Sequence, residues 1–183
     1  MVEEATCLFD QWLDSGELEL VSRGQVKYLD FADYPHKAIG TLSLGRDYIV
    51  IIASVQMAIV AFVPTRASDV IAFEIGLDRK SHIQLMMEQI TQHWDRGERL
   101  GYFDHLFVPA KAFVVGMLTN GQNPRPDQTT AIMNYLESLG LEPRLKFFDN
   151  PRAQNWCSRG TIIVTCPDDE SEQAIVFIDG NLH

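Results

Sequence analysis

One continuous apolar segment dominates the hydrophobic pattern of this chain. In residues 49–63 only Ser54 and Gln56 are polar, and eight of the fifteen residues are β-branched. Branched side chains pack well on a pleated surface, so this composition favours strands over a helix. Because the segment does not alternate with polar residues, it predicts strands buried on both faces in the middle of a sheet. We expect two such strands, with a turn near residues 54–56.

Shorter segments that alternate or are rich in β-branched residues predict the remaining strands. They lie at residues 18–21, 26–31, 38–44, 69–77, 110–118, 142–148, 161–166 and 174–178. The last two flank an acidic segment and are expected to form a hairpin.

Helical spacing of apolar residues predicts three helices, at residues 3–15, 80–95 and 127–139, and residues 152–157 are expected to form a short helical turn. Gly16 and Gly140 follow two of these helices, where glycine favours the left-handed conformation of a helix C-terminus. We expect Leu141 to contact Leu136, as in a Schellman motif.

These elements together predict an α+β fold, with one mixed, mostly antiparallel sheet and amphipathic helices packed on one face. The length of 183 residues fits a single globular domain spanning residues 1–183. The polar, proline-containing segment at residues 119–126 is the candidate hinge or linker, and it would separate residues 1–118 from 127–183.

Charge and cysteine content limit the classes of partner. The net charge is −10, with eight acidic against two basic residues in 1–34 and nine against four in 126–183. Such ends would repel a phosphate backbone, so we do not expect direct nucleic-acid binding. The fifteen-residue apolar segment is shorter than the roughly 18 residues that a membrane span requires, so we expect no membrane partner. Three cysteines without disulfide or CxxC spacing, and an N-terminus without a signal-like segment, predict a cytoplasmic protein with reduced thiols.

Candidate catalytic residues are few. Cys157 has Arg152 and Arg159 nearby in sequence, and these cations would lower its thiol pKa if they were also close in space. Asp104 adjoins His105, and a carboxylate can orient an imidazole for base catalysis. The alternative is that all three have no catalytic role, since no partner nucleophile or base is identified.

No established motif for a nucleotide, a metal or a catalytic serine occurs, so no cofactor is expected. The acidic residues Asp168, Asp169 and Glu170 are the candidate ligands for a hard cation, because such ions prefer oxygen. The alternative is a solvated turn that keeps the hairpin soluble.

Two apolar helix faces are either core or a surface for a partner or a second copy. They comprise Leu8, Phe9 and Trp12 in the first helix, and Met86, Met87 and Trp94 in the second. With ample packing residues and no assembled chemistry, the sequence predicts a non-enzymatic, acidic, self-associating protein-binding module of the adaptor, regulator or chaperone type. The alternative is a small cytosolic hydrolase or transferase that uses Cys157 or the His105 and Asp104 pair.

Overall fold

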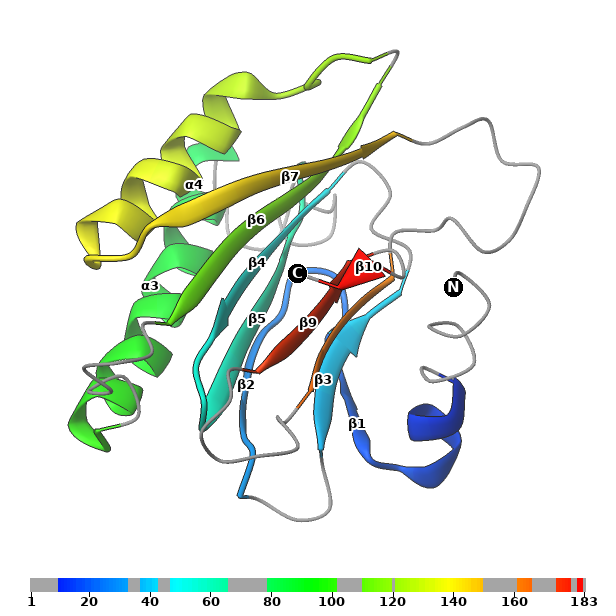
Figure 1. Ribbon diagram of the computed structural model, residues 1–183. Coiled ribbons are helices and arrows are strands. Elements are labelled where there is room, and N and C mark those ends of the chain that lie inside the picture. Colours follow the sequence, from blue (N-terminus) through cyan, green and yellow to red (C-terminus); the bar gives the residue numbers. More distant parts are fainter. Residues whose placement is uncertain are drawn as a thin grey trace.

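Two five-stranded β-sheets pack face to face, and two long helices cover the outer face of one of them (Figure 1). This arrangement comes from a computed structural model, which describes residues 10–32, 37–42, 47–65, 79–101, 110–119, 121–149, 161–165, 174–178 and 181–182.

The first sheet, called sheet A, has the strand order β1-β3-β8-β9-β10. Its strands are β1 (Leu18–Leu20), β3 (Ala38–Thr41), β8 (Ile162–Thr165), β9 (Ile175–Ile178) and β10 (Asn181–Leu182). The second, called sheet B, has the order β2-β5-β4-β6-β7. Its strands are β2 (Val26–Asp30), β5 (Met57–Val63), β4 (Tyr48–Ala53), β6 (Lys111–Leu118) and β7 (Pro143–Asp149).

The long apolar segment forms β4 and β5 at the middle of sheet B, with the turn at residues 54–56 as predicted. Successive residues of each strand alternate between two separate cores. Ile49 and Ile51 pack between the sheets, whereas Val50 and Ile52 pack beneath the helices. The strand residues of the segment are all apolar, which fits strands that are covered on both faces.

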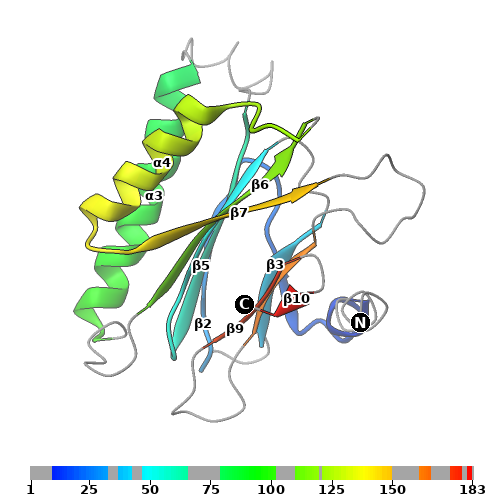
Figure 2. The same cartoon turned by 45° about the horizontal axis from the view of Figure 1, so that its top comes forward.

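The helices α3 (Arg79–Arg99) and α4 (Pro126–Ser138) lie side by side on sheet B, on the side away from sheet A (Figure 2). Helix α3 contacts β5 and β2, and α4 contacts β6 and β7. A short hydrogen bond joins Thr91 of α3 to Tyr135 of α4. Within the described residues, no helix has the length and apolar content needed to cross a membrane.

The α+β class and the mostly antiparallel pairing are confirmed, since only β1–β3 and β6–β7 are parallel among the described strand pairs. The strands form two sheets, however, where the sequence pattern predicted one. The reason is that β4 and β5 need cover on both faces. The helices supply it on one face and sheet A on the other.

Both predicted helix ends are confirmed. Gly16 and Gly140 have φ of 73° and 80°. The amide of Leu141 donates to the carbonyl of Leu136 at 3.2 Å, and both side chains are buried in one cluster, which completes a Schellman motif. The strand predicted at 69–77 and the helical turn predicted at 152–157 lie outside the described residues.

The candidate linker at 119–126 connects two neighbouring strands of one sheet. Strand β6 precedes it, and β7 follows after α4. These two strands pair in parallel from Ala112 and Pro143 to Leu118 and Asp149. The segments on either side of the loop therefore share sheet B.

Candidate binding surface at the β7 edge

Strand β7 lies at the edge of sheet B and pairs only with β6 among the described strands. An edge strand directs half of its peptide N–H and C=O groups away from its sheet, where another strand can pair with them. At seven residues, β7 is longer than β1 and β10, the two edge strands of sheet A, which have three and two residues. The other edge strand of sheet B, β2, has five residues, so β7 is the longest of the described edge strands. Strand β2 also contacts α3.

The side chains of β7 alternate between apolar and basic. Phe147 packs under the helices, and Leu145, on the same face, is 38% exposed. Arg144 pairs with Phe113 and Lys146 with Val115, and those two β6 residues belong to the core between the sheets. Arg144 and Lys146 therefore lie on the inter-sheet face of sheet B. Since Arg144 is exposed and Lys146 half-buried, sheet A does not cover this part of that face.

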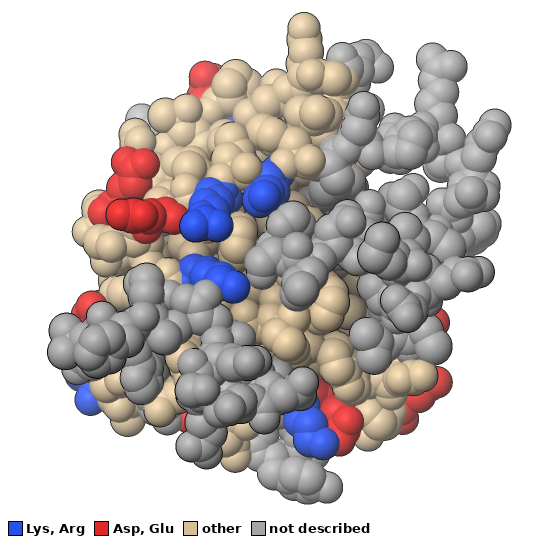
Figure 3. Space-filling model, in the orientation of Figure 1, with Lys and Arg blue, Asp and Glu red and all other residues tan. Residues whose placement is uncertain are grey.

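Lys111 at the start of β6 adds a third cation on the same face, two residues before Phe113. Burial lowers the pKa of Lys111, and the positive charge of Arg144 lowers it further. In Figure 3, basic side chains gather over the region of β6 and β7. Arg144 and Lys146 form no side-chain ion pair or hydrogen bond within the described part of the chain. We call Lys111, Arg144 and Lys146 the basic triad.

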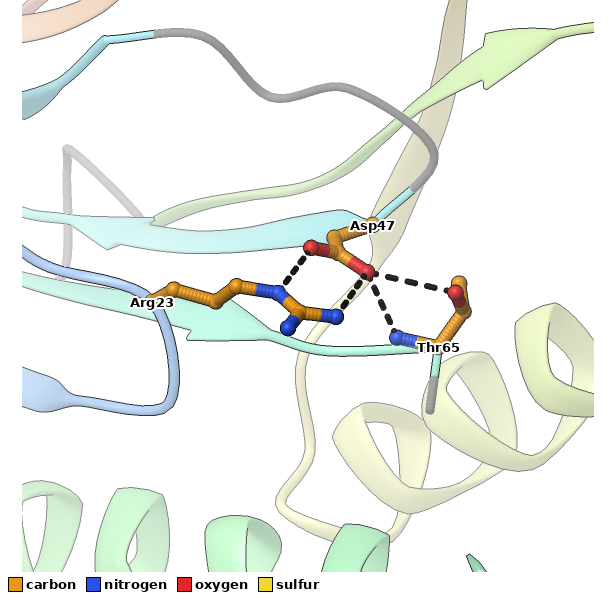
Figure 4. A network of polar contacts seen from close by, with 3 residues as sticks. All are labelled: Arg23, Asp47 and Thr65. Carbon is orange, nitrogen blue, oxygen red and sulfur yellow. Dashed lines mark hydrogen bonds and ion pairs between the residues drawn. The ribbon is translucent and has the colours of Figure 1, made fainter. Parts of the chain in front are cut away.

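Asp47 belongs to a separate polar junction, which serves the fold (Figure 4). Its carboxylate accepts hydrogen bonds from Arg23 Nε at 2.5 Å and from Arg23 Nη2 at 3.2 Å. It also accepts from the Thr65 amide at 2.8 Å and the Thr65 hydroxyl at 3.2 Å. The bond to Asp47 raises the pKa of Arg23. With four donors around it, this buried carboxylate is occupied in joining the β1–β2 turn to the ends of β4 and β5.

Tyr48, which is buried, anchors the loop before α4 through a ring of hydrogen bonds. Its hydroxyl donates to Asn123 Oδ1 at 2.8 Å, Asn123 Nδ2 donates to Thr129 Oγ1 at 2.9 Å, and Thr129 Oγ1 donates back to the Tyr48 hydroxyl at 2.9 Å. Burial raises the pKa of Tyr48. The three side chains of this ring are hydrogen-bonded to one another. We therefore assign the ring a structural role, which is to position α4 on the sheet.

Tyr48→Phe tests this anchor. The substitution removes the hydroxyl and leaves Asn123 Oδ1 and Thr129 Oγ1 each without one partner, so we expect a loss of about 1–2 kcal/mol in the free energy of unfolding. Urea denaturation followed by circular dichroism measures it. Thr130→Val, at an exposed position on the same helix, is the control and should change stability by less than about 0.5 kcal/mol. Equal losses in the two variants would contradict the anchoring role.

The apolar face proposed on the second helix is core in this structure. Met86, Met87 and Trp94 are 2%, 2% and 7% exposed and pack against sheet B, so this face is not available to a partner. Trp12 of the first helix is half-buried and packs on the outer face of sheet A with Leu18 and Ile163.

The remaining candidate residues lie outside the described part of the chain: Leu8, Phe9, Asp104, His105, Cys157, Asp168, Asp169 and Glu170. Among the residues that are described, no three His, Cys, Asp or Glu side chains come together to hold a metal ion.

Sequence reasoning missed the basic triad, although a signal for it was present. A strand, a helix and a strand in succession, at residues 110–118, 127–139 and 142–148, form the pattern of a parallel βαβ unit. Parallel neighbours begin at the same end of a sheet, so this pattern places Lys111 beside Arg144.

No protein-family model matches the sequence, and no curated protein matches it.

Proposed function

We propose that this protein is a non-enzymatic protein-binding module, of the adaptor, regulator or chaperone type, and that the edge of β7 is its main contact surface. The observation that carries the proposal is the combination of a seven-residue edge strand with exposed Arg144 and Leu145 side chains. An exposed edge supplies affinity through backbone hydrogen bonds, and alternating side chains supply specificity.

The polar groups elsewhere in the described core support a scaffold rather than a reaction centre. Asp47 is surrounded by Arg23 and Thr65, and the Tyr48 hydroxyl is enclosed by Asn123 and Thr129. Neither group is presented to a substrate, because both hold secondary-structure elements together.

Self-association is part of the proposal, and its support lies on sheet A. Leu13, Leu20 and Leu42 are 43%, 38% and 42% exposed in and around the edge of sheet A formed by β1. Exposed leucines in neighbouring segments offer apolar area to a second copy.

The test combines light scattering with affinity capture from the lysate of the native host. We expect the purified chain to form a dimer or to retain a specific protein, and we expect Arg144→Glu with Lys146→Glu to reduce that retention. Arg99→Glu, an exposed cation at the end of α3, is the matched control. A chain that stays monomeric at all concentrations and retains no protein would contradict the proposed function.

A further inference from the structure

We infer that β7 binds an acidic peptide in extended conformation, which joins sheet B as a sixth strand with its carboxylates over the basic triad. This inference rests on the proposed function and specifies the chemistry of the partner. It is carried by two neighbouring features: an edge strand whose only partner among the described strands is β6, and three cations on one face of the same sheet.

The backbone of β7 favours an extended partner. Its register with β6 is continuous for all seven residues, without a bulge that would twist the edge away. Bulges, prolines, short length and charged side chains are the usual protections of an edge strand. The one proline of β7, Pro143, stands at the first position, and its basic residues, Arg144 and Lys146, repel a basic strand but attract an acidic one. The edge from Arg144 onward can therefore pair with a strand of about six residues.

The side chains of the triad favour an acidic partner. Arg144 and Lys146 lie on one face at a spacing of two residues, so every second side chain of an added strand lies next to this face. Carboxylates at those positions would contact both cations. Burial is the main cause of the lowered pKa of Lys111, and the nearby charge of Arg144 lowers it further, which shows that these two cations lie close enough to act on the same ligand.

Electrostatic repulsion also disfavours a second copy of β7 as the strand added at this edge. Two β7 strands paired across a two-fold axis would bring Arg144 and Lys146 of both copies to the same face of the joined sheet. Like charges opposite one another destabilise strand pairing. A nucleic acid is also disfavoured, because it cannot use the strand edge and the chain carries a net charge of −10.

The experiment measures binding of a fluorescent seven-residue peptide, Glu-Thr-Glu-Val-Glu-Thr-Glu, by anisotropy at low salt. Three probes serve as comparisons: the same peptide with Lys for Glu, a version with Pro for both Thr, and a single-stranded oligonucleotide. The proline version keeps the charge but loses amide donors and strand geometry. We expect the acidic peptide to bind, the lysine and oligonucleotide probes not to bind, and the proline version to bind about tenfold more weakly.

Variants locate the site. Arg144→Gln with Lys146→Gln should raise Kd for the acidic peptide about tenfold, since it removes two partly exposed charge pairs. Arg99→Gln should leave Kd unchanged. Glu142→Gln should lower Kd about twofold, because Glu142 is exposed directly before β7 and adds a negative charge near the site. Circular dichroism of each variant verifies that the fold is retained.

The outcomes separate this inference from the proposed function. Absence of acidic-peptide binding, or equal binding of the proline version, would overturn the acidic-strand inference. If a native protein is nevertheless retained from lysate, the proposed function stands and the partner uses another surface. Preferential binding of the oligonucleotide would overturn the inference in favour of a phosphate ligand, whereas binding that depends on Arg144 and Lys146 and on an extended peptide would establish it.

Discussion

Gly40→Ala should lower the free energy of unfolding by about 3 kcal/mol, because the added methyl group has no space between β3 and β8 of sheet A. Gly40 on β3 lies opposite Ile163 on β8. A Cβ at this position would overlap the backbone carbonyl oxygen of Ile162 and lie 3.3 Å from Ile163 Cα. Since backbone atoms within a paired strand cannot rotate away, β3 and β8 would have to separate.

Thermal unfolding followed by circular dichroism measures this effect, and a loss of about 3 kcal/mol corresponds to a melting temperature about 6–12 °C lower. Gly121→Ala is the matched control. Gly121 has φ of 73°, and a methyl group at this residue would meet no atom within 4 Å, so its replacement introduces only backbone strain. That strain costs about 1 kcal/mol. If both variants lost the same stability, the close approach of β3 and β8 would be refuted.

Asp47→Ala should lower the free energy of unfolding by about 2–3 kcal/mol, because it leaves a buried backbone amide without its acceptor. Asp47 is 8% exposed, and its carboxylate receives the Thr65 N–H at 2.8 Å. Without the carboxylate, that amide stays buried and unpaired. Arg23 also loses its bonds to Asp47, although its side chain is 47% exposed and can turn toward water.

Arg23→Gln and Asp47→Asn divide this effect into its parts. Arg23→Gln should lose about 1 kcal/mol or less, because its ion pair is partly exposed and Asp47 keeps both bonds from Thr65. Asp47→Asn retains an acceptor oxygen for Thr65, so its loss in the free energy of unfolding should lie between those of Arg23→Gln and Asp47→Ala. Guanidinium denaturation of the three variants gives the order. A larger loss for Arg23→Gln than for Asp47→Ala would show that the ion pair, and not the buried amide, determines stability here.

The sequence pattern correctly predicted those features of the fold that depend on a few neighbouring residues. The helix of residues 127–139 and its end at Gly140 follow from apolar spacing and from the left-handed preference of glycine, both of which act within a few residues. The turn at residues 54–56 was predicted between two apolar strands, and the Ser54 hydroxyl accepts the amide of Met57 at 3.1 Å there. That bond closes the turn without any contribution from distant residues.

Pairing between distant segments was beyond the reach of the pattern. Strand β3 pairs with β8 more than a hundred residues away, and β1 pairs in parallel with β3. Alternation of apolar residues shows that a strand has a buried face, but it does not show which strand lies beside it. The sequence pattern was therefore compatible with one sheet, and the structure has two.

The candidate surface at β7 was likewise predictable from the sequence only in part. The sequence alone predicts a strand at residues 142–148 and two strands buried on both faces within residues 49–63. The position of β7 at an edge, and the covering of Met86, Met87 and Trp94, are known only from the packing of distant segments in the structure. The cause is that the period of apolar residues reflects only the direction in which each side chain leaves its own helix or strand. The exposure of a side chain and its distance from other charges depend instead on which segments pack against that helix or strand.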